Sequence, residues 1–357
     1  MNKTTVSNLV NELMQESLLK ESLATTSEKG RKPIILSINN SQSFFFAVDI
    51  KVGLIYMALY DLAGERRNLI TIKKENPHLN PEALIDDILY QLEGLCRQNG
   101  YDLRSVHSIG VSVPGMIDLS TNEVIFSPNL GWHHVELGEI AERKLPSWIR
   151  FQADNDANLA LEAEIWKGDN IPPRTSTVFV SVNRGVGTGI SFGGGVYRGN
   201  TYGAGAFGHT IVSADGPVCS CGQRGCWERY VSVQKLITDY YGEEGETKDI
   251  DRALSLIRLR FLDGDAKAKK VIHEEAYWLA LGIANICLSL DPQLIIVGGY
   301  IRRMWDLLGD SVTREVQRRL SACSKGNIKI VGSSFDGWEN LEGAAILAMS
   351  VELPFQF

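Results

Sequence analysis

The stretch Cys219-Ser-Cys-Gly-Gln-Arg-Gly-Cys-Trp-Glu228 carries the strongest signal in the chain, and His209 lies ten residues before its first cysteine. Zinc prefers about four soft or borderline ligands in a tetrahedron, and three thiolates with one imidazole supply a closed set. Gly222 and Gly225 allow a short segment to fold back, so that the thiolates converge on one ion. The sequence therefore predicts a structural zinc ion bound by His209, Cys219, Cys221 and Cys226. The alternative is a reduced, metal-free loop with a surface histidine.

The composition is that of a soluble globular protein, and the length suggests about two domains. The chain has 357 residues, 44% of them hydrophobic, and a net charge of −7, which argues against a broad surface that coats nucleic acid. It has no apolar run of the roughly 20 residues that a membrane helix needs and no apolar leader, so we expect a cytoplasmic protein that does not bind membranes. The remaining cysteines are isolated and are interpreted as packing residues: Cys96, Cys287 and Cys323.

Two α/β units follow each other from about residue 43. In the first, strands are predicted at 44–48, 53–60, 108–113 and 148–153, with helices at 81–99 and 155–168. The second has a strand at 177–182, a glycine-rich loop at 183–189, a helix at about 267–289, a strand at 294–297 and a final helix at about 341–351. Two such units in series predict a two-lobed molecule with a cleft between the lobes.

Residues 2–19 form a predicted amphipathic helix that starts at the N-cap Asn2. Its apolar positions repeat at i, i+3, i+4 and i+7, and its polar face suits either solvent or a DNA major groove. Residues 20–38 predict two short strands around a basic tip, which is the layout of a wing that touches phosphate. The candidate DNA-binding residues are Lys3, Thr4, Thr5, Ser7, Asn8, Arg31 and Lys32.

The cysteine stretch resembles the Cys-x-Cys-Gly-x-x-Gly-Cys-x-Glu signature of the ROK family, which comprises repressors, open reading frames and sugar kinases. The family's other motifs are matched in order by Pro114-Gly115, Ser127-Pro-Asn-Leu-Gly-Trp132, Asn155-Asp-Ala-Asn158, Gly185-Val-Gly-Thr-Gly-Ile190, Tyr197-Arg-Gly199, Gly208-His209 and Gly343-Ala-Ala345. The N-terminus resembles the latter part of the winged helix-turn-helix of ROK repressors, xylose repressors above all. The chain begins at what would be the recognition helix.

This resemblance implies an α/β fold of the two-lobed, actin-like ATPase (ribonuclease H-like) class, preceded by a partial winged helix-turn-helix. The implied domains are 1–40, a first lobe of 41–155 plus 333–357, and a second lobe of 156–332 with the zinc site. The resemblance also implies a sugar in the interlobe cleft, contacted by Gly115, Asn155, Asp156, His209 and Glu228. In the kinases the residue that matches Asp156 is the general base, whereas the plain alternative for Asp156 is an acid favoured in the first turn of a helix.

Three positions depart from the family pattern. Ala206 stands where the family commonly has a sugar-binding glutamate, and a methyl group cannot accept a hydrogen bond from a hydroxyl. The first phosphate turn reads Asp49-Ile-Lys-Val-Gly53 in place of Asp-x-Gly-Gly-Thr, so Lys51 and Val52 bring side chains into a turn that should be bare backbone. The second phosphate loop opens with Asn183-Arg184-Gly185 in place of Gly-Thr-Gly.

We therefore expect a sugar-responsive transcriptional regulator, a repressor of sugar-utilisation genes, rather than an enzyme. Its expected partners are a sugar effector, operator DNA and a second or further copies of itself as a homodimer or homotetramer. One alternative is an ATP-dependent sugar kinase resembling a glucokinase. Another is a sugar-binding module that has lost DNA binding.

Overall fold

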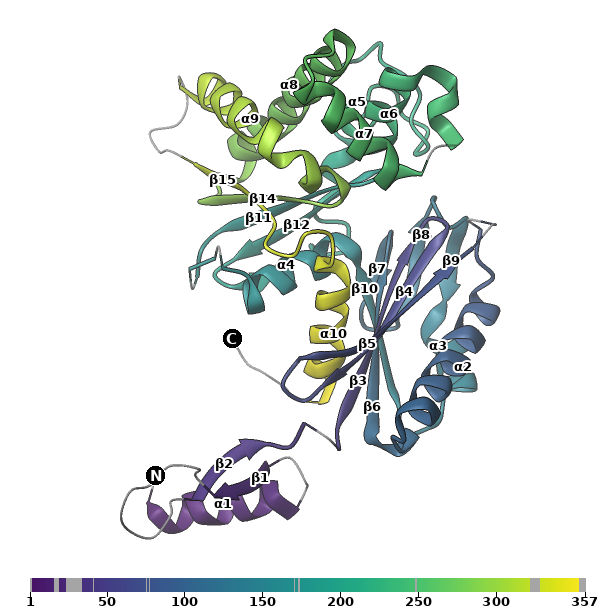
Figure 1. The fold of residues 1–357 in the computed structure, drawn as a ribbon, viewed down its shortest axis with the longest axis vertical. Coiled ribbons are helices and arrows are strands. Elements are labelled where there is room, and N and C mark those ends of the chain that lie inside the picture. The colour runs from purple at the N-terminus through teal and green to yellow at the C-terminus, as the bar shows by residue number, and fades with distance from the viewer. Residues whose placement is uncertain are drawn as a thin grey trace.

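The computed structural model describes residues 2–15, 19–23, 34–40, 42–74, 76, 78–169, 171–172, 174–247, 249–321 and 328–352. Its N-terminal unit consists of helix α1 (Lys3–Gln15) and an antiparallel ribbon of β1 (Leu19–Leu23) and β2 (Ile34–Ile38). The unit lies at one end of the molecule (Figure 1). The predicted cap is confirmed, because the Thr5 amide donates to Asn2 Oδ1 over 2.8 Å.

The predicted helix was too long at its C-terminal end. The described helix reaches Gln15, residues 16–18 lie outside the described residues, and Leu19 pairs with Ile38 in the ribbon. Pairing with β2 satisfies the backbone of this segment as a strand, so tertiary contacts override its helical periodicity. The two short strands predicted in 20–38 are confirmed, while their basic tip lies outside the described residues.

The first lobe is built on a five-stranded sheet with the order β10-β6-β3-β4-β5. Its strands are β3 (Phe44–Lys51), β4 (Leu54–Asp61), β5 (Arg66–Lys73), β6 (Val106–Val113) and β10 (Arg150–Asn155). β3, β6 and β10 are parallel, while β4 runs antiparallel to both of its neighbours. A three-stranded antiparallel sheet lies in the same lobe and contains β7 (Met116–Asp118), β8 (Glu123–Ser127) and β9 (Trp132–Glu136).

The second lobe repeats this strand arrangement. Its sheet has the order β13-β12-β11-β14-β15, with β11, β14 and β15 parallel and β12 antiparallel to β11 and β13. The strands are β11 (Thr177–Val182), β12 (Val186–Phe192), β13 (Gly195–Val196), β14 (Leu294–Gly298) and β15 (Lys329–Gly332). In each sheet the first strand forms an antiparallel hairpin with the next strand on one side, and on its other side lie two later strands that run parallel to it. The two lobes are therefore topological repeats of one α/β unit.

Helices cover both sheets and fill the space between them (Figure 1). The outer face of the first sheet packs on α2 (Pro81–Asn99) and α3 (Leu137–Lys144). The outer face of the second packs on α5 (Glu228–Val231), α6 (Val233–Tyr241), α7 (Ile250–Leu262), α8 (Ala266–Leu290) and α9 (Trp305–Leu320). Between the sheets, α10 (Glu339–Glu352) lies on β3 and β6, α4 (Asp156–Lys167) lies on β11 and β12, and the two helices contact each other.

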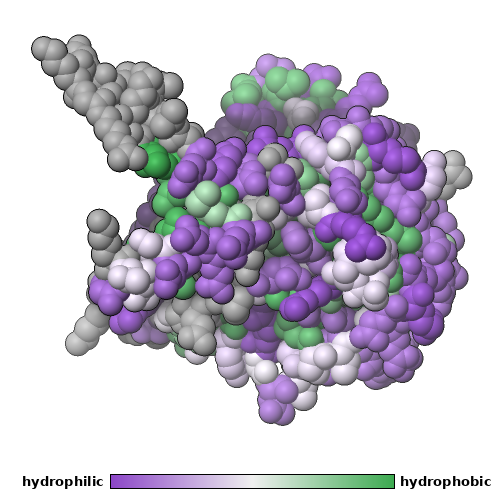
Figure 2. Space-filling model, turned by 90° about the horizontal axis from the view of Figure 1, so that it is seen from below, coloured by the Kyte–Doolittle hydropathy of each residue, from purple (hydrophilic) through white to green (hydrophobic). Residues whose placement is uncertain are grey.

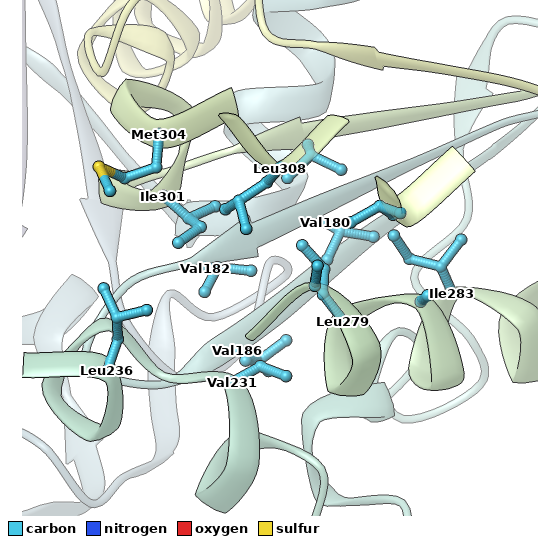
Figure 3. Close-up of a cluster of buried hydrophobic side chains, with 14 of the residues drawn as sticks. Val180, Val182, Val186, Val231, Leu236, Leu279, Ile283, Ile301, Met304 and Leu308 are labelled. Carbon is cyan, nitrogen blue, oxygen red and sulfur yellow. The ribbon is translucent and has the colours of Figure 1, made fainter. Parts of the chain in front are cut away.

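Side-chain alternation explains this layering. In β3, Phe44, Phe46 and Val48 face the α2 side, whereas Ala47 faces α10. Small residues are required on the inner face because α10 approaches closely: a Cβ at Gly110 would lie 2.0 Å from the Ala344 carbonyl oxygen. In the second lobe, Val180 and Val182 of β11 pack on Leu279 and Ile283 of α8, as Figure 3 shows.

The predicted glycine-rich loop at 183–189 is mostly strand, which is a correction. Only residues 183–185 form the turn, and β12 then pairs with β11. The glycines serve packing against α4, because a Cβ at Gly189 would lie 2.5 Å from the Ala157 carbonyl oxygen. The strand predicted at 148–153 is shifted and runs from Arg150 to Asn155.

The sequence predicts mostly helices after the cysteine stretch, and α6, α7 and α9 confirm this, although only the helix at about 267–289 was given bounds. The elements that were not predicted are β5, the sheet β7-β8-β9, α3, β15 and the 3₁₀ turns η1 (Leu103–Ser105), η2 (Ala206–His209), η3 (Gly242–Thr247) and η4 (Tyr300–Met304). The buried Cys96 and Cys287 are packing residues as predicted, and Cys323 lies outside the described residues. Within the described residues no helix combines the length and the apolarity that a membrane crossing requires.

Candidate functional site

The four predicted metal ligands lie together. His209 ends η2, and the three cysteines lie on the loop that leads to α5. Their ligand atoms all lie within 4.8 Å of one another. Cys219 Sγ is 3.6 Å from His209 Nδ1, and Cys221 Sγ is 3.6 Å from Cys226 Sγ. Tetrahedral zinc–thiolate bonds separate two sulfurs by about 3.7 Å, so this group has the size that one such ion requires.

The loop backbone brings the thiols together. The Cys219 amide donates to the Gln223 carbonyl over 2.8 Å, and the Gly222 amide donates back to the Cys219 carbonyl over 3.0 Å. Gly225 has φ +73°, and a Cβ at this position would lie 1.6 Å from the Ser213 carbonyl oxygen. A glycine is therefore required there for the turn that presents Cys226.

Glu228 connects the thiol cluster to the cleft between the lobes. Cys219 Sγ donates to Glu228 Oε1 over 3.0 Å, and His209 Nδ1 lies 3.8 Å from the same oxygen. Burial and this carboxylate raise the pKa of the Cys219 thiol above its ordinary value. A cation bound here would offset that effect, since it stabilises the thiolate.

A cavity of about 780 Å³ opens beside this cluster and is lined by both lobes. This volume falls within the usual range for small-molecule sites. All five residues predicted to contact a sugar line it: Gly115, Asn155, Asp156, His209 and Glu228. Ala206 lines it as well, so the methyl group that replaces the family's usual carboxylate faces the same space.

Asn155 is positioned by the start of α4. Its Oδ1 accepts from the Ala157 and Asn158 amides over 2.9 and 3.2 Å, which makes it the N-cap of that helix. Its Nδ2 donates to the Gly115 carbonyl over 2.8 Å. Asn155 thus joins the turn after β6 to the first turn of α4.

Asp156 is the most strongly perturbed carboxyl group in the cavity. Burial, followed by the charge of the nearby Asp49, raises the pKa of Asp156 to about 7. The first-turn amide of Ala157 also donates to Asp156 Oδ1, over 2.9 Å. A carboxyl group that titrates near neutrality is suited to accepting a proton or a hydroxyl hydrogen bond.

Lys51 lines the cavity at the end of β3, where the first lobe approaches Tyr300 of the second. Its Nζ lies 3.4 Å from Asp49 Oδ2, 5.3 Å from the centre of the Tyr56 ring and 5.5 Å from that of Tyr300. Burial would lower the pKa of Lys51, but Asp49, Tyr300 and Glu339 outweigh it and raise the pKa. The side chain therefore places a fixed ammonium group in the turn between β3 and β4.

The predicted DNA-binding residues lie far along the chain from this cavity. Thr4, Thr5, Ser7 and Asn8 are exposed on α1, and the Thr5 hydroxyl donates to Asn2 Oδ1 over 2.9 Å. The Lys3 side chain, Arg31 and Lys32 lie outside the described part of the chain. The opposite, apolar face of α1 is also exposed, with Val6 at 46% and Leu9 at 42%. Figure 2 shows this end of the molecule, where hydrophobic patches lie among hydrophilic residues.

Sequence reasoning missed several residues of the cavity wall, among them Asn129, Asn158 and Tyr202. Asn129 and Asn158 lie inside motifs that match the family, so their polar side chains could have been predicted to line the cavity. Tyr202 has a left-handed backbone, φ +57°, in a loop with no pattern of its own. It could not have been assigned to the cavity from sequence.

Sequence comparisons with known proteins point to one family. The model of the ROK family matches residues 45–351. The xylose repressor of Bacillus subtilis is 30% identical over an alignment that covers 94% of this chain and 84% of the repressor.

Two solved structures share the fold. A ROK family glucokinase from Streptomyces griseus, in complex with glucose and AMPPNP, is 26% identical with a TM-score of 0.73 and covers 86% of this chain and 99% of its own. A ROK family transcriptional regulator described as a homologue of the E. coli MLC protein is 22% identical with a TM-score of 0.77 and covers 98% and 89% of the two chains.

Proposed function

The chain belongs to the ROK family, and from that premise we propose that it is a sugar-responsive transcriptional repressor. One observation carries the proposal: an α1–ribbon unit precedes the family domain, which starts at residue 45. The two lobes of that domain line a cavity that contains several polar side chains. The B. subtilis xylose repressor aligns with 94% of this chain, whereas the S. griseus glucokinase is covered almost whole and leaves part of this chain without a counterpart.

The cavity is the proposed sugar site. Asp156, Glu228 and the amide of Asn155 offer acceptors and donors for neighbouring hydroxyls, which gives a selectivity that apolar contact alone does not provide. His209 would contribute from the metal side, and the backbone at Gly115 would lie against the ring. Because Ala206 offers no acceptor, a ligand hydroxyl that faced it would lose one hydrogen bond.

The His209–Cys219–Cys221–Cys226 group is the proposed zinc site, and its spacing and donor types fit that ion. Four protein ligands leave no open position, so bound zinc would supply structure rather than hydrolysis. The four ligand residues would then hold the segment from His209 to Glu228, which lines part of the cavity, in one conformation.

Control of DNA binding would follow from closure of the two lobes. A sugar that binds the closed form better than the open form shifts the population toward closure. In an oligomer that shift changes the spacing of the α1 helices, and two half-sites on operator DNA are sensitive to that spacing. The polar face of α1, with Thr4, Ser7 and Asn8, is the proposed reading surface, and a homodimer or homotetramer is the proposed assembly.

Sugar kinase activity is the second candidate, and Asp156 favours it. A carboxylate with a pKa of about 7 in the cavity has the properties of a general base. Lys51 argues against it. Its ammonium group and the Asp49 carboxylate form a pair in the turn where the family resemblance implies bare backbone for phosphate. A sugar-binding module without DNA binding is the third candidate.

Two assays on zinc-replete protein separate these functions. A thermal-shift panel of pentoses and hexoses should show a shift with at least one sugar, because ligand binding to the native state raises its stability. No shift with any of them would count against the sugar site. Sugar-dependent release of ADP from ATP, measured with a coupled assay at high protein concentration, would overturn the non-catalytic proposal, and its absence would exclude the kinase.

A further inference from the structure

The loop 197–205 joins β13 to η2 and forms one wall of the cavity. Tyr202, Gly203, Ala204 and Gly205 line the cavity, as do Ala206 and His209 directly after them. The opposite wall begins with Asn155, Asp156 and Asn158 at the junction of β10 and α4. The two walls come from different segments of the chain, so a ligand between them requires their separation to be fixed.

Arg198 bridges these walls without lining the cavity itself. Its Nε and Nη2 donate to Asp154 Oδ2 over 2.9 and 2.7 Å, and Nη2 also donates to Glu162 Oε1 over 2.5 Å. Asp154 ends the first-lobe sheet beside Asn155, and Glu162 lies on α4. The Asp154 side chain is 2% exposed, whereas those of Arg198 and Glu162 are 21% and 19% exposed, so the Asp154 end of this fork is shielded from water.

Two of these residues, Asp154 and Arg198, also bond to groups on the two walls. The other oxygen of Asp154, Oδ1, accepts from the Asn155 amide over 2.6 Å and from Asn158 Nδ2 over 3.5 Å. On the other side, the Arg198 carbonyl accepts from the Ala204 amide over 3.1 Å and so closes the loop. A continuous chain of hydrogen bonds therefore runs from Asn155 and Asn158, through Asp154 and Arg198, to Ala204.

We propose that Arg198 is a positioning residue for the sugar, holding the loop 197–205 at a fixed distance from the Asn155–Asp156 wall through its fork to Asp154 and Glu162. The inference rests on the proposed sugar site. A planar guanidinium suits this role because it can bond two carboxylates in a fixed geometry, whereas a lysine ammonium offers one point charge. Replacing a residue that orients a metal ligand from behind typically changes metal affinity or activity about 10- to 100-fold, and we expect an effect of that size on sugar affinity here.

The proposal predicts that sugar affinity depends on pH through the titration of Glu162. The charged groups that act on Glu162 are Arg198 from the loop and Asp154 from β10, and burial raises the pKa of Glu162 to about 7. Above pH 7 the ionised Glu162 holds Arg198, and below pH 7 its protonated form resembles glutamine. Wild type should therefore bind sugar more tightly than Glu162→Gln above pH 7, and the two should converge below it. Asp156 is present in both proteins, so its titration does not change the difference in sugar affinity between them.

The test uses the full zinc-replete chain as wild type, Arg198→Lys, Glu162→Gln and, as a matched control, Arg150→Ala, which removes an exposed arginine paired with Glu352 at 3.1 Å. Calorimetric titration uses the sugars that shift the thermal midpoint of wild type. Arg198→Lys should weaken binding about 10-fold or more, and Arg150→Ala should leave it unchanged. Hydrogen exchange without sugar should be faster in residues 197–209 of Arg198→Lys than in wild type.

Three results are decisive against the inference. Equal sugar affinity in wild type and Arg198→Lys would overturn it while leaving the proposed function intact. Equal sugar affinity in wild type and Glu162→Gln above pH 7 would overturn the role of the fork, and this variant serves if Arg198→Lys does not fold. Failure of wild type to bind any sugar would remove the proposed function and this inference with it.

Discussion

At the scale of single residues, Glu228 belongs to both candidate sites, the metal cluster and the cavity. Its carboxylate accepts from the Cys219 thiol and lies 3.8 Å from His209 Nδ1, yet it also lines the cavity. A metal ion that held His209 and Cys219 would fix the atoms that orient Glu228. Zinc binding and ligand binding are therefore expected to be coupled through these three residues.

Replacing one thiol tests that coupling. Cys221→Ser should lower the bound zinc from about one ion per chain to near zero and abolish the sugar-induced thermal shift, because a closed site needs all four donors. Elemental analysis and thermal shift provide the readouts, with Cys287→Ala, a buried cysteine outside the cluster, as the control that keeps its metal. Full metal content in Cys221→Ser would show that the four-ligand assignment is wrong.

Restoring a carboxylate at position 206 tests the sugar wall. Ala206→Glu places an acceptor in the cavity where a ligand hydroxyl now has none, and should strengthen sugar binding by about 1–3 kcal/mol. Ala206→Gln, which has the same length without the charge, separates hydrogen bonding from electrostatics in a calorimetric titration. Unchanged affinity in both variants would place the ligand's hydroxyls away from this residue.

Asp156 should make stability depend on pH. Because its pKa is about 7 in the folded chain and near 3.9 when exposed, its contribution to stability is present below about pH 4 and lost as pH rises to 7. Asp156→Asn should therefore stabilise the protein more at pH 8 than at pH 5.5, in denaturant unfolding curves. Asp118→Asn is the control without this pH dependence, because hydrogen bonds from Ser120 lower the pKa of Asp118 and the group is ionised at both pH values in the folded and the unfolded chain. An equal effect of Asp156→Asn at both pH values would contradict the raised pKa.

At the scale of elements, the packing of α10 on α4 holds the two lobes together. A Cβ at Gly343 of α10 would lie 2.0 Å from the Leu159 carbonyl oxygen of α4, whereas a Cβ at Gly94 of α2 would meet nothing within 4 Å. Gly343→Ala should therefore destabilise the protein by about 1–3 kcal/mol. Gly94→Ala should stabilise it by about 0.4–1 kcal/mol, because alanine restricts the unfolded chain more. Urea midpoints of the pair measure both, and equal effects would contradict the close α4–α10 contact.

Elements with a strong local pattern were predictable from sequence. Helix α2 matches its predicted bounds, because Asn80 caps it, proline begins it and Gly100 ends it in a left-handed turn. The stretch 183–189 misled the prediction, because its glycines indicate a loop locally but are required by the contact of β12 with α4. Short elements such as β13 and α5 have too few residues for any periodicity and depend on their neighbours.

The residues of the candidate site differ in how far the sequence predicts them, because some lie close together in the chain and others do not. The four metal-ligand candidates lie within eighteen residues, so spacing and chemistry identified them together. Asn155, Asp156 and Glu228 needed the family resemblance, because their distance in sequence conceals their common cavity. The bridge from Arg198 to Asp154 and Glu162 joins three elements and has no linear signature.

At the scale of the whole molecule, one repeated topology accounts for the cleft. Both sheets have the same strand order, their inner faces pack on α10 and α4, and the cavity lies where the two lobes meet. Lys51 of the first lobe lies near the Tyr300 ring of the second, so this pair also bridges the two lobes. Closure of this cleft is the motion through which a sugar would act on the N-terminal unit.

The most direct test of the proposed repressor function is fluorescence anisotropy of a labelled duplex taken from the DNA directly upstream of the gene that encodes the chain. We predict that zinc-replete protein binds this duplex with an affinity that falls steeply with salt, and that a sugar which shifts its thermal midpoint releases it. Binding that no such sugar alters, or no binding even at low salt, would contradict a sugar-responsive repressor.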